Sequence, residues 1–306
     1  MTCVVYGEEK KSNQLTPERE AEFKEHMDRK VEARKEKYKD KKDAEENDKV
    51  YVAAFDMEAV LTAPSNLTSI MYYKRKLSVY NLTVFSLGNK DATCYLWNET
   101  EGQRGSNEVG TCLYKHILSL PKTIEHVILY SDTCGGQNRN QCITAALHHA
   151  VKTIPNIKTI DQKFLESGPS QMECDTVHAC IERQKKRVQI NHPHDLNLLI
   201  STNQKVKWLK IKWIRVTKED KDTIYFKYRI PDQQFRQIKI QGTSRRRGRP
   251  RVQCPLLTAL YTDRLPISDA KKKDLEAMCD SLVVPRSHHA FYRDLPCSSS
   301  VKQKWI

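Results

Sequence analysis

The alternation of apolar and polar residues predicts a regular series of strands and helices in the middle of the chain. Strands are indicated by short apolar or alternating runs, and helices by apolar residues three and four positions apart. The predicted strands are 50–61, 71–87, 93–97, 126–132 and 158–165, and the predicted helices are 106–120, 141–154 and 175–189. Three strands thus come first, and after them helices and strands alternate.

The flanking segments have a different pattern. Thr16, Pro17 and the acids that follow are typical of a helix start, and the helix expected over 17–46 has only a thin apolar stripe among alternating charges. We therefore expect an exposed helical arm, or a short element for self-association. Residues 206–216 and 223–230 alternate aromatic and aliphatic residues with lysine and arginine, which predicts a β-hairpin with one basic face. Segments 267–278 and 285–295 predict a small helical tail.

The order strand, strand, strand, helix, strand, helix, strand, helix is that of a ribonuclease H-like fold. The predicted fold class is therefore α/β, with a mixed sheet that has helices on both faces. Composition divides the chain into a charged helical arm over 1–49, a ribonuclease H-like domain over 50–200, and a region over 201–306 with the basic hairpin, an arginine-rich string and the helical tail.

The positive charge of the chain is concentrated in one region. Of the net charge of +14, residues 183–251 account for 20 basic and 5 acidic side chains. Such a concentration predicts a polyanionic partner, which we take to be DNA, while a merely solvated basic face is the alternative. No apolar run approaches the ~18 residues of a membrane span, and the first residues lack an apolar leader. We expect a soluble intracellular protein with no membrane partner.

Two of the predicted apolar strands contain aspartates, which suggests a metal site. Asp56 lies in VYVAAFDMEAV and Asp132 ends HVILYSD. The first and fourth strands of a ribonuclease H-like sheet are neighbours, so the two carboxylates would meet and a divalent cation would relieve their repulsion. Two Mg²⁺ or Mn²⁺ ions in such a site can support phosphodiester cleavage or strand transfer. For the third acid, Asp175 is preferred, Glu182 is a reserve ligand and Glu173 is another candidate.

The segment after Asp132 predicts contacts to a nucleic-acid backbone. Gly135 and Gly136 permit close approach, and a helix begins directly afterwards, where backbone amides favour phosphate oxygens. Gln137, Asn138 and Arg139 would then contact the backbone. A tight strand-to-helix turn is the other interpretation of the same residues.

Several segments carry a resemblance to a known family, namely FDMEAVL, YYKRKLSVYNLTVF, GSNEVGTCLYKHI, ILYSDTCGGQNRN, KFLESGPSQMECDTVH and LPISDAKKKDLEAMC. Together they resemble an uncharacterised, insect-expanded family of transposon-derived proteins with a ribonuclease H-like, transposase-type domain. The resemblance spans roughly residues 15–295, and its most specific part is the Ser-Asp-x-Cys-Gly-Gly-Gln-Asn motif. It implies Asp56, Asp132 and Asp175 as an acidic triad. Relatives usually have Gly-His-Ser/Thr where this chain has Gly168-Pro169-Ser170, so a histidine near the implied site is missing.

An arginine-rich string near the hairpin resembles an AT-hook. An extended Gly-Arg-Pro core fits the narrow minor groove of A·T tracts, where arginine is attracted by the negative potential. Its residues are Arg245, Arg246, Arg247, Gly248, Arg249, Pro250 and Arg251. A nuclear-import signal or a surface linker are the other interpretations, and we expect a nuclear protein.

Three functions follow from these features. The first is a transposase-derived nuclease or strand transferase that acts on DNA and holds Mg²⁺ or Mn²⁺ with the acids named above. The second is a catalytically inactive, domesticated protein that binds DNA or other partners, which the missing histidine favours. The third is a 3′–5′ exonuclease, because Asp56-x-Glu58 resembles the first motif of acidic exonucleases.

Overall fold

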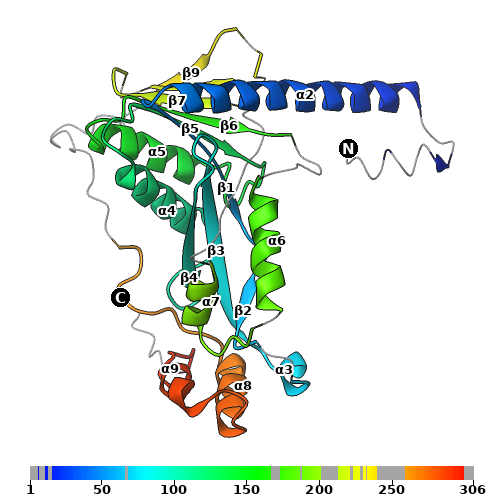
Figure 1. The fold of residues 1–306 in the computed structure, drawn as a ribbon, viewed down its shortest axis with the longest axis vertical. Helices are drawn as coiled ribbons and strands as arrows, with labels where there is room; N and C mark the ends of the chain where they lie inside the picture. Colours follow the sequence, from blue (N-terminus) through cyan, green and yellow to red (C-terminus); the bar gives the residue numbers. More distant parts are fainter. Residues whose placement is uncertain are drawn as a thin grey trace, which may run out of the picture.

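A computed structural model describes most of the chain (Figure 1). The described residues are 6, 11–12, 16–65, 68–166, 173–186, 188–200, 213–220, 223–227, 230–231, 233–239 and 259–299. The arginine-rich string at 245–251 and Pro169 lie outside them, as does the first half of the hairpin's first strand.

The described residues form an α/β structure built on one open, mixed sheet of nine strands. In chain order the strands are β1 (Val50–Met57), β2 (Leu61–Ala63), β3 (Leu77–Ser86), β4 (Ala92–Asn98), β5 (His126–Ser131), β6 (Thr159–Phe164), β7 (Trp213–Thr217), β8 (Thr223–Lys227) and β9 (Arg236–Lys239). The spatial order is β2-β3-β1-β5-β6-β7-β8-β9, with β4 on the free side of β3. Strands β1, β5 and β6 are parallel, and every other pairing is antiparallel.

The predicted neighbourhood of the first and fourth long strands is confirmed. β1 pairs with β5 in parallel, from Val50 opposite His126 to Ala54 opposite Tyr130. β1 is buried along almost its whole length, which explains its continuous apolar sequence, since a strand covered on both faces has no solvent side. β2 then continues along the same edge of β3 that β1 occupies, so the two strands are separated only by a break at residues 58–60.

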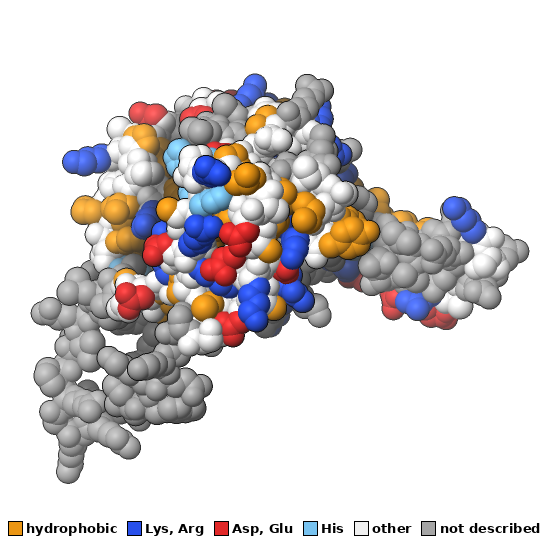
Figure 2. All heavy atoms as spheres, turned by 90° about the horizontal axis from the view of Figure 1, so that it is seen from below, with side chains coloured by type: hydrophobic (Ala, Val, Ile, Leu, Met, Phe, Trp, Pro, Cys, Tyr) orange, Lys and Arg blue, Asp and Glu red, His pale blue; other side chains and the backbone are white. Residues whose placement is uncertain are grey.

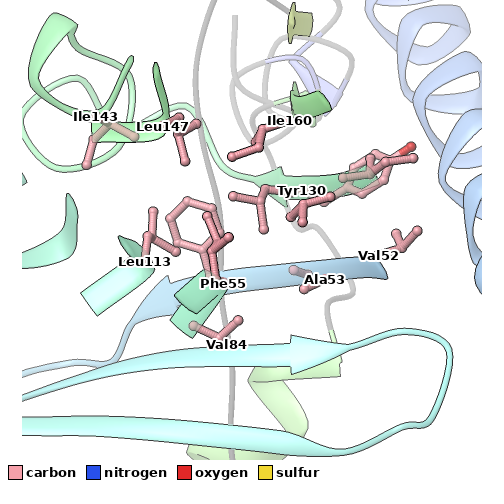
Figure 3. Close-up of a cluster of buried hydrophobic side chains, with 14 of the residues drawn as sticks. Val52, Ala53, Phe55, Val84, Leu113, Tyr130, Ile143, Leu147 and Ile160 are labelled. Atoms are coloured by element: carbon pink, nitrogen blue, oxygen red, sulfur yellow. The ribbon is translucent and has the colours of Figure 1, made fainter. Parts of the chain in front are cut away.

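Helices cover both faces of the sheet (Figure 1). On one face lie α4 (Ser106–Ser119) and α5 (Gln141–Thr153), whose apolar stripes meet the sheet. Phe55 of β1 points toward Leu113 of α4 and Ile143 of α5 in this core (Figure 3). The opposite face is covered by α2 (Pro17–Glu46) and α6 (Glu173–Lys185).

A smaller cluster closes the far end of the sheet. Its elements are α3 (Ile70–Tyr73), α8 (Asp269–Asp280), the 3₁₀ turn η1 (Arg286–His288) and α9 (His289–Arg293), whereas α7 (Pro193–Ile200) packs with α6 through Leu196. Met71 and Leu77 share a buried cluster with Leu275 and Tyr292 from the C-terminal helices. The helical tail expected over 267–295 is therefore present, but part of the strand expected over 71–87 is the short helix α3. Helix α7 was not predicted.

Helix α2 begins as predicted but is not an exposed arm throughout. Thr16 Oγ1 accepts a hydrogen bond from the Arg19 backbone N–H at 3.3 Å. In the second half of the helix, Ala33 belongs to the main core and Asp40 is buried against β5 and β6. The pattern of apolar residues does not predict that α2 packs on the sheet, because charged side chains form most of the contact between them.

The described part of the predicted basic hairpin forms two antiparallel strands, and they belong to the main sheet. β7 pairs with β8 on one side and with β6 on the other. One buried cluster contains Ala33, Ile214 and Ile230 together with residues of β1 and β5. The three segments that composition separates therefore share one core. None of the described helices combines the length and apolar character needed to cross a membrane.

Candidate functional site

The two strand aspartates lie at the same edge of the sheet. Asp56 comes two residues after Ala54, and Asp132 comes two residues after Tyr130, the position paired with Ala54. Because β1 and β5 are parallel, both carboxylates stand at the carboxyl ends of adjacent strands. Both are partly buried. The sequence-based expectation that these two acids come together agrees with this register.

Asp132 is held in place by the loop that follows it. Its Oδ1 accepts hydrogen bonds from the Cys134 backbone N–H at 2.9 Å and from Asn138 Nδ2 at 3.2 Å. Asn138 is fully buried, and its own N–H donates to the Cys134 carbonyl at 2.9 Å. Asn138 thus orients the carboxylate from inside the loop, whereas we expected it to contact nucleic acid from the surface.

Two of the helix amides expected to bind phosphate are already occupied. Asn140 caps α5, because its Oδ1 accepts from the N–H groups of Cys142 at 3.0 Å and Ile143 at 3.2 Å. Gln137 and Arg139 remain partly exposed, so the prediction that they contact a nucleic-acid backbone stays open. A Cβ atom at Gly136 would have no neighbouring atom within 4 Å, so close packing does not require glycine there.

None of the three candidate acids on α6 joins Asp56 and Asp132 in a ligand group within the described part of the chain. Asp175 is exposed on the first turn of α6. Glu173 forms an ion pair with Lys37 at 2.6 Å, and Glu182 forms one with Lys185 at 2.9 Å. Within the described ranges, no three His, Cys, Asp or Glu side chains are grouped so that they could hold a metal ion.

Glu58 is a buried acid next to this site. It lies in the break between β1 and β2, is 2% exposed, and its Oε2 accepts from Asn81 Nδ2 at 2.8 Å. Among the described residues, Oε1 has no hydrogen-bond partner. Burial raises the pKa of Glu58 to about 7; Asn81 and Lys185 lower it and Glu182 raises it. Its only sequence signal was the Asp56-x-Glu58 spacing.

A histidine of helix α6 contacts the sheet next to the position of Asp56. Thr83 of β3 is paired with Asp56, and its Oγ1 lies 3.3 Å from His178 Nε2. Burial lowers the pKa of His178 to about 4, so this imidazole is neutral at physiological pH. No pattern in the sequence indicates that this histidine contacts Thr83, the residue paired with Asp56.

The donor chemistry at this edge fits a divalent cation only in part. Two carboxylates supply the hard oxygens that Mg²⁺ and Mn²⁺ prefer. A two-ion site needs a further ligand to connect the ions, and the three candidate acids on α6 are exposed or engaged in ion pairs. The residues therefore fit one ion between two carboxylates better than the two-ion site expected from the sequence.

A cavity of about 320 Å³ lies elsewhere, near the start of β1. Tyr51 and His116 line it, and the Tyr51 hydroxyl is 2.8 Å from His116 Nε2. Neither Asp56 nor Asp132 contributes to its wall. The cavity is therefore separate from the strand ends that hold the acids.

The surface at the α8 end is of mixed charge (Figure 2). Asp274 accepts from Lys74 at 3.1 Å and from Arg75 Nη1 at 2.9 Å, and Lys271 pairs with Glu99 at 2.6 Å. The described part of this face is thus no uniformly basic surface.

A search of family models finds none that matches the chain, and a comparison with curated proteins finds no significant match.

Proposed function

We propose that this protein is a transposase-derived, ribonuclease H-like protein that acts on DNA phosphodiesters at Asp56 and Asp132. The observation that carries the proposal is the placement of these two carboxylates at equivalent positions of two adjacent parallel strands. The order β4-β3-β1-β5-β6, in which only β3 runs antiparallel to the other four strands, is also the arrangement expected of a ribonuclease H-like sheet. A helix after the fifth of these strands, here α6, completes that pattern.

The protein's own residues would prepare the site for a cation and a phosphate. The Cys134 amide and Asn138 fix the Asp132 carboxylate before any ligand arrives, which reduces the ordering needed on binding. A bound Mg²⁺ or Mn²⁺ would supply Lewis acidity toward a phosphate oxygen. The DNA substrate and the nuclear location are parts of the same proposal.

The test is nicking of a supercoiled plasmid by the full chain with Mg²⁺ or Mn²⁺. We expect nicking that disappears in Asp56→Asn and in Asp132→Asn, which keep the shape of the side chain. Asp294→Asn is the matched control, because its side chain is 85% exposed and follows the C-terminal helix α9, outside the strands that carry the two acids. Nicking that persists in both strand variants would refute the proposal. Preference for end-labelled over circular DNA would point to the exonuclease alternative.

One observation favours a second candidate, a catalytically inactive DNA-binding protein. The described residues hold no group of three metal-ligating side chains, and Glu182 and Glu173 are each paired with a lysine. If the wild-type protein binds A·T-rich duplex with a steep salt dependence and no divalent cation supports cleavage, this second function is the correct one.

A further inference from the structure

The outer face of helix α2 carries a row of exposed apolar side chains. Met27, Val31 and Tyr38 are 37%, 44% and 62% exposed, respectively. Together with Arg34 they recur at intervals of four, three and four residues, which places all four on one side of the helix. This side differs from the one that lies on the sheet, where Ala33 is buried. Because alternating intervals of three and four form the seam of a coiled coil, the row predicts a second helix as its partner.

The charged residues on one flank of this row fit a reversed copy of the same helix. Asp28 and Lys35 each follow a member of the row by one position. Both side chains are exposed, and neither forms an ion pair or a hydrogen bond with any other described residue. When two such helices lie antiparallel with Met27 opposite Tyr38, Asp28 of each helix comes beside Lys35 of the other. The outer face of α2 is therefore complementary in charge to itself.

Two further observations favour the antiparallel orientation over the parallel one. It brings the exposed Glu20 of each helix beside the exposed Lys42 of the other, whereas a parallel pair would place Arg34 against Arg34. The N-terminal part of α2 also extends beyond the strands (Figure 1), and no side chain of residues 17–25 is buried. An antiparallel pair places the body of the second copy beside this projecting part, so the two bodies lie at opposite ends of the helix pair.

We propose that the outer face of α2 binds α2 of a second copy of this chain in antiparallel orientation. Met27 of one copy packs against Tyr38 of the other, and Val31 packs against the aliphatic part of Arg34. Asp28 and Lys35 form an ion pair between the copies, twice by symmetry. The interface is small, so we expect a dissociation constant in roughly the micromolar range. The inference goes beyond the proposed function and does not depend on it.

The first experiment measures the dimer by sedimentation velocity of the full chain at increasing concentration. The wild type should change from monomer to dimer, and Val31→Glu should weaken the dimer at least about tenfold, because the seam would then bury an unpaired charge. Leu118→Glu is the matched control, since Leu118 is 56% exposed on another helix, α4, and this variant should dimerise like the wild type. Circular dichroism checks that both variants remain folded.

A charge exchange tests the orientation. Asp28→Lys alone sets two lysines against each other at both ends of the two-fold axis, and Lys35→Glu alone does the same with two acids, so each variant should be mainly monomeric. An equal mixture of the two variants should form a heterodimer about as tight as the wild type, because every pair then joins opposite charges. Raising the salt concentration should weaken the heterodimer and the wild-type dimer alike.

Each outcome bears on the proposal. A wild type that stays monomeric up to about a hundredfold above the micromolar range overturns it, as it would if α2 served a different protein. A dimer that persists in Val31→Glu, or is lost equally in Leu118→Glu, also overturns it, because the contact would then lie elsewhere. If the mixture of the two charge variants stays monomeric, the antiparallel pairing is wrong. None of these results changes the expected nicking by Asp56 and Asp132, which the plasmid assay tests separately.

Discussion

The ammonium of Lys163 on β6 lies 2.6 Å from Oδ2 of Asp40 on α2, although both side chains are nearly excluded from solvent. Lys163 also donates to Glu36 at 2.7 Å, and it lies 3.8 Å from the ring centre of Trp213 on β7. Tyr130 of β5 donates its hydroxyl to the same Asp40 carboxylate. This ionic cluster joins α2 to three strands and explains why a highly charged helix lies on the sheet.

Removal of Lys163 should therefore be costly. In Lys163→Met the buried Asp40 loses its cation, and burial already raises the pKa of that carboxyl. We expect the free energy of unfolding to fall by about 3–5 kcal/mol, measured by urea denaturation. The control is Lys49→Met, whose ammonium is exposed and pairs with Glu125 at 3.1 Å; here a change within about 1 kcal/mol is expected. Equal losses in the two variants would show that the buried cluster does not hold α2.

Stability should also depend on Asp161 at acid pH. This carboxyl is buried, which raises its pKa, but hydrogen bonds from His126 and Arg215 lower the pKa to about 2. Since the folded value is below the ordinary 3.8, ionised Asp161 contributes about 2 kcal/mol above that pH, and the contribution is lost as the pH falls toward 2. In denaturation at decreasing pH, the stability difference between wild type and Asp161→Asn should shrink over this range. A difference that stays constant would mean that Asp161 does not titrate with folding.

A cation that binds between Asp56 and Asp132 should stabilise the folded protein. Saturating Mn²⁺, at about a hundredfold over its dissociation constant, would add about 2.7 kcal/mol and raise the thermal midpoint. We expect this rise to disappear in Asp132→Asn and to persist in Asp294→Asn, as measured by calorimetry. If Mn²⁺ raises the midpoint of all three proteins alike, the ion binds elsewhere.

Asn140 should act as a helix cap. Its side chain accepts from two amides at the start of α5, so Asn140→Ala should reduce the free energy of unfolding by about 1 kcal/mol. Asn140→Asp should retain most of the stability, because an aspartate oxygen can accept the same bonds. Should the aspartate variant be as unstable as the alanine variant, the residue has a role other than capping.

Local pattern was sufficient where apolar contacts decide the structure. Helices α4 and α5 begin at Ser106 and Gln141, as their spacing predicts, because each has one apolar face that must meet the sheet. The break after Met57 and the short helix α3 were not predicted. In that segment, Met71 and Leu77 pack against the C-terminal helices, which are distant in the sequence.

The candidate site was predictable only in part, for a related reason. Asp56 and Asp132 stand out because acids in apolar strands are rare. Two further features depend on how the loop after β5 and helix α6 pack against the sheet. These are the burial of Asn138 and the contact of His178 with Thr83. Nothing in the local sequence distinguishes these residues from surface ones.

The sequence by itself determined the order of the long central strands and helices, the start of α2 and the two strand acids, because apolar periodicity, capping residues and misplaced charges are local properties. Tertiary structure alone decided that α2 lies on the sheet, that β7 extends it, and that Glu173 and Glu182 of α6 pair with lysines. These outcomes depend on ion pairs and packing between segments far apart in the chain. The energy of such pairs depends on burial, which the sequence does not specify.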